Sequence, residues 1–275
     1  MTKKDLFSVH NKVVLVTGAS GLIGNQICRA FLNAGAYVIS GVHTAATMPA
    51  LREALGRKYK SDRFLVCELD ITNEESIAEC LELAAGKFTK VDVLINNAAI
   101  DAKFDHKRVD DLSTCRFEDY PIELIETSLR VNVLGTIKMT QAFCRHVLPL
   151  AGGCIINVGS TYSLIAPNLG LYDFPASKVR YKPVDYVASK SFVPNFTRYI
   201  ATLYGRDGIR CNAIAPHGVF DGHDDDFVDS FSKLSPLGRM CEKDELAAAF
   251  VFLASEGSTY ITGITMLVDG GWTAW

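Results

Sequence analysis

Short apolar runs alternate with longer amphipathic stretches along the 275-residue chain. The short runs are rich in valine and isoleucine, as buried strands are, and comprise Val13–Thr17, Tyr37–Val42, Phe64–Cys67, Val91–Ile95, Cys154–Val158, Ile209–Ala215 and Ile264–Val268. The stretches between them have helical periodicity and comprise Leu22–Asn33, Met48–Lys58, Glu74–Ala85, Ile122–Leu148, Tyr186–Leu203 and Lys243–Ser255. Near-continuous apolar strands that alternate with helices are typical of a parallel sheet covered on both faces. The pattern predicts an α/β fold with one doubly wound sheet of about seven strands, in a single domain over residues 1–275.

Two polar segments, 101–119 and 163–185, interrupt this alternation. Each follows the carboxyl end of a predicted strand, which is the edge where open α/β sheets bind ligands. Long loops in compact domains are usually functional or disordered. We therefore expect both segments to be insertions that line a substrate pocket.

Composition narrows the class of protein. The chain is 48% hydrophobic and 21% charged with a formal net charge of −3, which is ordinary for a globular protein and gives no basic face for nucleic acid. No apolar run is long enough to cross a bilayer, no secretory signal follows the charged N-terminus, and nothing points to a metal site. The eight cysteines form no C-x-x-C pair and indicate buried free thiols in a cytoplasmic protein.

The first predicted strand runs directly into Gly18-Ala19-Ser20-Gly21-Leu22-Ile23-Gly24 and then into a helix. Glycines at this turn of a Rossmann-type fold let the backbone approach a pyrophosphate, which sits on the helix N-terminus. The second strand ends in Ser40–Thr44 without the carboxylate that would repel a 2′-phosphate, and His43, Thr44 and Ser20 are donors that could bind one. The sequence therefore favours NADP(H) over NAD(H).

Further motifs follow in order on the later elements: Asn96-Asn97-Ala98-Ala99, Arg130-Val131-Asn132-Val133, Ile156-Asn157-Val158-Gly159-Ser160, Tyr186-Val187-Ala188-Ser189-Lys190 and Val268-Asp269-Gly270-Gly271. Together with the glycine turn, and across residues 12–271, they resemble the short-chain dehydrogenase/reductase family in its single-domain branch. The resemblance implies that Asn132, Ser160, Tyr186 and Lys190 are the catalytic residues.

The chemistry of these residue types suits hydride transfer. Tyr186 and Lys190 are four residues apart and share one face of a helix. An ammonium beside a phenol favours the phenolate, so Tyr186 can act as general acid for a ketone or general base for an alcohol. The Ser160 hydroxyl can hold the substrate oxygen. By the resemblance, Lys190 also binds the nicotinamide ribose and Asn132 anchors a water that relays protons.

The same resemblance assigns the other cofactor contacts. Asp70 would meet the adenine, Asn96 the adenosine ribose, and the Ala215–Val219 segment the nicotinamide carboxamide, although Asp70 could instead cap the helix that begins near Asn73. The expected cofactor-binding residues are Gly18, Ser20, Gly21, Leu22, Ile23, Gly24, His43, Asp70, Ile71, Asn96, Ala98, Tyr186, Lys190, Pro216, Gly218 and Val219.

The sequence also departs from the family pattern. Ser160 and Tyr186 are 26 positions apart, more than is usual, which leaves Ser163 as an alternative catalytic serine. The glycine spacing is that of two-domain relatives, but the closing Val-Asp-Gly-Gly strand leaves no room for a second domain. His217 replaces a glycine and is either a substrate contact or structural. The basic Lys178, Arg180 and Lys182 either meet an anionic substrate or belong to a solvated loop.

The leading hypothesis is an NAD(P)-dependent oxidoreductase that acts on an alcohol or ketone of a polar, sugar-derived small molecule. The alternatives are a 3-oxoacyl carrier-protein reductase and a non-catalytic dinucleotide-sensing regulator. The insertion, Pro236–Met240 and the terminal Gly-Gly-Trp-Thr-Ala-Trp give a weaker similarity to a subgroup linked to bacterial surface-sugar and flagellin-glycan pathways. Relatives in the family pair their long helices, so we expect a homotetramer or dimer with Trp272 and Trp275 near a subunit contact.

Overall fold

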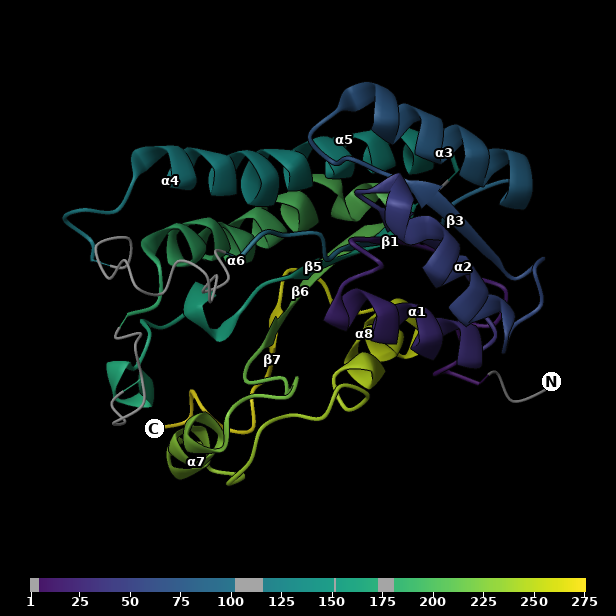
Figure 1. The fold of residues 1–275 in the computed structure, drawn as a ribbon. Coiled ribbons are helices and arrows are strands. Elements are labelled where there is room, and N and C mark those ends of the chain that lie inside the picture. The colour runs from purple at the N-terminus through teal and green to yellow at the C-terminus, as the bar shows by residue number, and fades with distance from the viewer. Residues whose placement is uncertain (1–4, 102–115, 151, 173–180) are drawn as a thin grey trace.

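All the described strands lie in one parallel sheet, in the order β3-β2-β1-β4-β5-β6-β7 (Figure 1). The computed structural model describes residues 5–101, 116–150, 152–172 and 181–275. The strands are β1 (Val13–Thr17), β2 (Tyr37–Val42), β3 (Phe64–Glu68), β4 (Val93–Asn96), β5 (Gly153–Val158), β6 (Ile209–Pro216) and β7 (Thr265–Val268). The predicted doubly wound α/β sheet is confirmed.

Helices cover both faces of this sheet. They are α1 (Leu22–Asn33), α2 (Met48–Gly56), α3 (Glu74–Phe88), α4 (Ile122–Leu129), α5 (Thr136–Val147), α6 (Val184–Tyr204), α7 (Asp225–Leu234) and α8 (Ala247–Ala254). In Figure 1, α3, α4, α5 and α6 lie on one side of the sheet and α1, α2 and α8 on the other. The strand order reverses between β1 and β4, and a crevice for a ligand forms at such a point in open α/β sheets.

The alternation of side chains along β1 builds two separate cores. Val14 and Val16 point into the cluster formed with α1, α2 and α8, whereas Val13 and Leu15 point into the cluster formed with α3, α5 and α6. All five residues of β1 are buried. A strand buried on both faces explains why the sequence reads as a continuous apolar run rather than an alternating one.

The predicted helix at 122–148 is interrupted, because residues Arg130–Gly135 between α4 and α5 form a π-helical segment. Such segments occur inside α-helices and often mark functional sites. The apolar periodicity continues through the segment, so the sequence gives no sign of it. The predicted helix at 243–255 is also shorter than expected, since α8 begins only at Ala247.

The two expected insertions are described only in part. Residues 102–115 and 173–180, which include Lys178 and Arg180, lie outside the described residues. The described flanks of both insertions lie at the carboxyl edge of the sheet. Asp101 follows β4, and Lys182 precedes α6. Ser160 follows β5 at this edge, and Tyr186 and Lys190 lie on α6, which begins beside it.

Candidate active site

Tyr186 and Ser160 meet at the carboxyl edge of the sheet. Ser160 follows β5 and is buried, and Tyr186 lies in the first turn of α6. The Ser160 hydroxyl forms a hydrogen bond with the Tyr186 phenol. The edge of the Tyr162 ring packs on Tyr186, with 6.5 Å between the ring centroids. One substrate oxygen could therefore contact both hydroxyl groups.

Lys190 lies one helical turn beyond Tyr186 and is buried. Its Nζ donates a hydrogen bond to the backbone carbonyl of Val158 at 2.9 Å and lies 5.9 Å from the centroid of the Tyr186 ring. Burial lowers the pKa of Lys190 to about 8. The ammonium is thus fixed by the last residue of β5, on the strand that leads to Ser160.

The ammonium of Lys190 alone would lower the pKa of Tyr186, but in the structure this pKa is raised. Burial raises this pKa well above its ordinary value, the Asp101 carboxylate raises it further, and the hydrogen bond with Ser160 opposes both. A phenolate in a buried site is costly unless positive charge is close to it. The sequence pattern shows the neighbouring lysine but not the burial.

The two candidate serines have different partners. Ser163 lies in a short 3-10 turn, Thr161–Ser163, and its Oγ accepts a hydrogen bond from the backbone nitrogen of Ser160 at 3.1 Å. Ser160 Oγ accepts a hydrogen bond from the backbone nitrogen of Tyr162 at 3.2 Å and also reaches Tyr186. The long separation in sequence has therefore not moved Ser160 away from the tyrosine.

Asn132 lies in the π-helical segment, and its side chain is committed to structural hydrogen bonds. Its Oδ1 accepts a hydrogen bond from the backbone nitrogen of Ile100 at 2.8 Å. Its Nδ2 donates hydrogen bonds to the backbone oxygen of Ile100 at 2.8 Å and to Ser189 Oγ at 3.0 Å. The backbone carbonyl of Asn132 accepts a hydrogen bond from Thr136 Oγ1 at 2.8 Å. Asn132 thus joins the segment after β4 to α6.

A second lysine, Lys182, covers the face of the Tyr186 ring. Its Nζ lies 4.1 Å from the ring centroid and forms hydrogen bonds of 2.7 and 3.0 Å with the two carboxylate oxygens of Asp101. From the sequence, Lys182 is expected either to meet an anionic substrate or to belong to a solvated loop, and Asp101 marks only the start of an insertion. No local pattern connects two residues 81 positions apart, so sequence reasoning had no signal for this pair.

The glycine turn is held against the end of β4. Thr17 Oγ1 accepts hydrogen bonds from the backbone nitrogens of Asn97 and Ala98 at 3.0 and 2.9 Å, and Asn97 Nδ2 donates to the backbone oxygen of Thr17 at 2.9 Å. Gly18 has a φ of +65°, a backbone conformation that residues other than glycine rarely adopt. A Cβ on Gly24 would overlap the carbonyl oxygen of Gly18. The Asn-Asn-Ala-Ala motif contains Asn97, although only its neighbours Asn96 and Ala98 are expected to contact the cofactor.

The residues at the start of α1 fit a dinucleotide phosphate. Gly21 is the N-cap, no side chain caps the helix, and its first turn has no acidic residue. The first backbone N–H groups of a helix need a partner from outside the helix, and an anion can supply it. A Cβ on Gly21 would meet only the carbonyl oxygen of Gly18, at 3.4 Å, so the approach to these N–H groups is open. Ser20 and Gly21 are exposed, and Leu22 and Ile23 are half-buried.

The predicted adenosine contacts have structural partners of their own. Asp70 Oδ1 accepts hydrogen bonds from the backbone nitrogen and the hydroxyl of Thr72 at 2.8 and 2.7 Å. Burial acts to raise the pKa of Asp70, but these hydrogen bonds oppose it and the pKa is lowered. The N-cap of α3 is Asn73, not Asp70. Asn96 is buried and donates to Thr140 Oγ1 at 3.0 Å and to Asn157 Oδ1 at 2.9 Å. Both hydrogen bonds use Nδ2, so a ribose contact at Asn96 would come from its Oδ1 or from its backbone. His43 is exposed after β2, and Ile71 is buried.

His217 follows β6 and is nine-tenths buried. Its Nδ1 shares a hydrogen bond of 2.7 Å with Thr161 Oγ1, and its ring lies 4.2 Å from the Trp272 ring and 5.3 Å from Phe231, centroid to centroid. Its Nε2 has no hydrogen-bond partner in the described part of the chain. Burial lowers the pKa of His217 to about 4.

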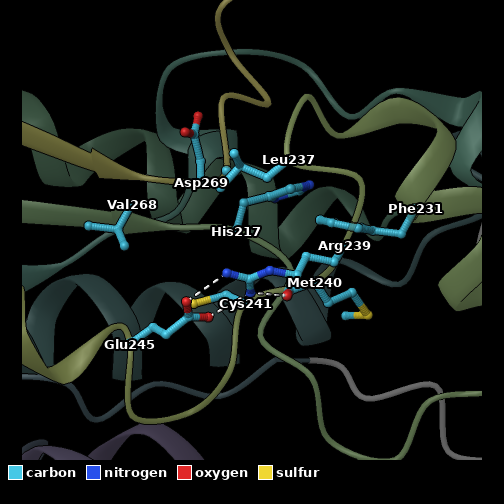
Figure 2. A pocket seen from close by; sticks show the side chains of 10 residues that line it. His217, Phe231, Leu237, Arg239, Met240, Cys241, Glu245, Val268 and Asp269 are labelled. Atoms are coloured by element: carbon cyan, nitrogen blue, oxygen red, sulfur yellow. Dashed lines mark hydrogen bonds and ion pairs between the residues drawn. The ribbon is translucent and has the colours of Figure 1, made fainter.

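A small cavity of about 110 Å³ lies beside His217 (Figure 2). Phe231, Met240 and Val268 give it an apolar lining, and the Arg239–Glu245 ion pair, at 2.7 Å, lies at its border. Gly218 has a φ of +58°, and a Cβ there would overlap the Phe231 ring. Pro216 ends β6, and Val219 pairs with Cys241 in a parallel bridge. The Pro216–Val219 segment therefore pairs with β7 at one end and with the segment before α8 at the other.

Within residues 5–101, 116–150, 152–172 and 181–275, no cluster of histidine, cysteine or acidic side chains is arranged to hold a metal ion. Across those same residues, none of the helices combines the length and apolarity that a membrane span requires.

Known proteins are similar to this chain in sequence and in fold over almost their whole length. The chain is 31% identical over 272 residues to the D-threitol dehydrogenase of Mycolicibacterium smegmatis, covering 97% of this chain and 95% of that protein. It is 30% identical over 289 residues to the gluconate 5-dehydrogenase of Gluconobacter oxydans, covering 99% of each. The crystal structure of a gluconate 5-dehydrogenase from Burkholderia cenocepacia in complex with NADP and tartrate has a TM-score of 0.83 and 25% identity, covering 98% of both chains.

A flagellin modification protein is also similar to this chain, at lower identity. Post-translational flagellin modification protein A of Campylobacter coli is 26% identical over 265 residues, covering 96% of this chain and 99% of that protein. Residues 18–273 match the family described as Enoyl-(Acyl carrier protein) reductase. Because this match runs from the glycine turn to the C-terminal strand and includes Ser160, Tyr186 and Lys190, the chain belongs to the short-chain dehydrogenase/reductase family of NAD(P)-dependent enzymes.

Proposed function

We propose that this enzyme transfers a hydride between a nicotinamide cofactor and the alcohol or ketone group of a polyol or sugar acid, as a single dinucleotide-binding domain acting in the cytoplasm. The observation that carries the proposal is the contact of the Ser160 hydroxyl with the Tyr186 phenol, with Lys190 one helical turn away. The relatives named for D-threitol and gluconate support the substrate class.

The residues divide the proton chemistry among them. Ser160 Oγ donates a hydrogen bond to the substrate oxygen and holds it beside the phenol. Tyr186 gives its proton to that oxygen when a ketone is reduced and accepts the proton when an alcohol is oxidised. Lys190, fixed by Val158, places positive charge near the phenol. When bound, the nicotinamide cofactor supplies or accepts the hydride.

The N-terminus of α1 and the glycine turn would hold the cofactor pyrophosphate. We propose a preference for NADP(H), because Val42 is buried where a discriminating carboxylate would stand, and Ser20, His43 and Thr44 are exposed nearby. Titration of both reduced cofactors by fluorescence tests the preference. Tenfold tighter binding of NADH, about 1.4 kcal/mol, would overturn it.

The test of the activity is a substrate panel. D-threitol, galactitol and gluconate are each offered with NADP⁺ and with NAD⁺, and formation of the reduced cofactor is followed by absorbance. We expect turnover of at least one of them by the native enzyme, and a kcat about 10²–10⁴-fold lower for the same substrate in Tyr186→Phe. Reduction of an acetoacetyl thioester with no turnover of any panel member would instead favour the carrier-protein reductase.

We also propose that the enzyme is a homo-oligomer, a tetramer or a dimer. Large apolar side chains are exposed on the neighbouring helices α4 and α6, including Ile122 and Tyr199. Trp275 is exposed at the chain end, whereas Trp272 is buried within its own chain against His217. A contact at the C-terminus would therefore use Trp275 rather than the Trp272 ring.

A further inference from the structure

The Tyr186 ring lies between two lysines, one four residues before it and one four residues after it. Nζ of Lys182 is 4.1 Å from the ring centroid and Nζ of Lys190 is 5.9 Å from it. The closer cation is thus not the lysine of the Tyr-x-x-x-Lys motif. Lys182 lies outside α6, before Pro183, and its position depends on a partner elsewhere in the chain.

Asp101 is that partner, and the Lys182 end of the ion pair is enclosed while the Asp101 end is open to water. Both carboxylate oxygens contact Lys182 Nζ, and the Lys182 side chain is only 11% exposed while that of Asp101 is 37% exposed. Exposed ion pairs contribute little because water screens them, but charges withdrawn from water act more strongly on their neighbours. The pair joins the segment after β4 to the segment before α6, directly against the tyrosine.

We propose that the Asp101–Lys182 ion pair sets the ionisation of Tyr186, with Lys182 as a positioning residue whose ammonium favours the phenolate and Asp101 as the counter-charge that limits this effect. The inference rests on the proposed role of Tyr186 as the general acid and base. Lys182 does not touch the substrate oxygen in this scheme and acts only through the tyrosine.

Within the described residues, several other groups surround the phenol. Ser160 and Tyr162 face it from the segment after β5, and Lys190 faces it from α6. Asp185, the residue before Tyr186, is buried and accepts a hydrogen bond from Ser128 on α4 at 2.5 Å. His217 lies beyond the Tyr162 ring, with centroids 5.4 Å apart. Asp101 is the carboxylate whose charge raises the pKa of Tyr186, and Lys182 lowers the pKa of Lys190.

These opposite charges predict opposite effects for the two members of one ion pair. In alcohol oxidation the phenolate is the base, so the rate rises with pH through the apparent pKa of Tyr186. Lys182→Met leaves the Asp101 carboxylate alone beside the phenol and should raise this midpoint. Asp101→Asn leaves the ammonium alone and should lower it. A charge at this distance moves a pKa by about one unit or more, and the Asp101→Asn, Lys182→Met double variant should lie between the two single variants.

The experiment measures the pH dependence of kcat in the native enzyme and the three variants, for oxidation of the panel member that the native enzyme turns over fastest. Lys182→Arg should restore the native midpoint, and Arg57→Met, which removes an exposed ion pair with Glu53 on α2, should leave it unchanged. The proposal would be overturned if the midpoint shifts in the same direction in both single variants, or shifts in neither of them. A pair with a purely structural role would lower activity without shifting the midpoint in opposite directions.

A second readout separates this inference from the proposed function. Ionisation of Tyr186 is followed by phenolate absorbance in the NADP⁺-bound protein, as the difference between each variant and the same variant carrying Tyr186→Phe. If the native enzyme oxidises no member of the panel, the proposed function fails, and this titration still decides whether the ion pair sets the ionisation of Tyr186. If Lys182→Met does not fold, the midpoint of Asp101→Asn is compared with that of the native enzyme. A lower midpoint in Asp101→Asn supports the proposal, and an equal or higher one overturns it.

Discussion

At the scale of single residues, the candidate site depends on how one phenol is surrounded. Burial makes the Tyr186 phenolate costly, and each neighbour changes that cost in a direction set by its charge or hydrogen bond. Lys190 is fixed on Val158 rather than on the phenol oxygen, so its influence is that of a nearby charge.

Replacing Tyr186 by phenylalanine isolates the proton transfer. The ring keeps its contacts with Tyr162 and Lys182, so stability and cofactor binding should be retained. We expect kcat to fall by about 10²–10⁴-fold, which is the usual contribution of a general acid or base. Steady-state kinetics and cofactor titration measure the two effects, and near-full activity in this variant would rule out the proton-transfer role.

The two serines should behave differently when each is changed to alanine. Ser160→Ala removes the hydroxyl that reaches Tyr186, so kcat should fall by about 10²-fold or more while the cofactor still binds. Ser163→Ala removes an acceptor for the backbone nitrogen of Ser160 and should retain most of the activity. Comparison of kcat for the two variants checks this assignment, which the reverse order of activities would contradict.

The buried His217 predicts a particular sensitivity to acid. Because burial lowers its pKa to about 4 from an unfolded value near 6.5, the unfolded chain binds more protons between these two pH values. The free energy of unfolding should therefore fall as the pH drops from 6.5 to 4, by at most about 1.4 kcal/mol per pH unit from this residue. Denaturant unfolding of the native protein and His217→Gln across this range should show a smaller slope in the variant. Parallel curves would assign the acid sensitivity to other groups.

At the scale of elements, the strands could be located along the chain because most of them are short apolar runs buried on both faces, although the edge strand β7 is only partly buried. The predicted Val13–Thr17 and Tyr37–Val42 have the bounds observed for β1 and β2. The interruption at Arg130–Gly135 could not be predicted, since a π-helical segment leaves the apolar pattern unbroken. The start of α8 was also missed, because Lys243–Leu246 fits a helical pattern that the structure does not continue there.

Candidate residues show the same division between local and distant information. Ser160, Tyr186 and Lys190 could be named because a local motif carries them, and the structure brings them together. Asp101 could not, since its contact with Lys182 spans 81 positions and depends on how two segments meet. The side-chain partners of Asn96 were equally hidden, as they lie on α5 and β5.

The turn between β1 and α1 offers a matched pair of glycines. Gly24→Ala places a Cβ against the carbonyl oxygen of Gly18 and 2.8 Å from Asn97 Nδ2, whereas the Cβ in Gly21→Ala meets only one atom at 3.4 Å. We expect Gly24→Ala to lower the free energy of unfolding by about 1–3 kcal/mol, as overpacking does, and Gly21→Ala to change it much less. Denaturant unfolding of both variants measures the difference, and equal losses would mean that the turn relaxes around the added methyl group.

At the scale of the whole molecule, the arrangement of helices leaves an apolar surface beside the site. α4 and α6 lie side by side on the same side of the sheet (Figure 1), and the π-helical segment continues from α4. Leu134 is 53% exposed and Tyr199 is 62% exposed on this part of the molecule. Exposed apolar patches rimmed by polar residues mark interaction sites. The same helix carries Tyr186 and Lys190, so assembly through α6 would also hold the catalytic helix in place.

This surface makes the proposed oligomer testable by charge. We expect the native protein to sediment as a dimer or tetramer at micromolar concentration, and Leu134→Lys combined with Tyr199→Lys to give a smaller species, because two ammonium groups would be buried without partners in the contact. Leu83→Lys is the matched control, since Leu83 is 55% exposed on α3, away from the α4–α6 pair, and should leave the assembly unchanged. A native monomer would contradict the proposal. Dissociation by Leu83→Lys alone would instead place the subunit contact on α3, and the activity of the dissociated species would then report how far the catalytic helix depends on its neighbour.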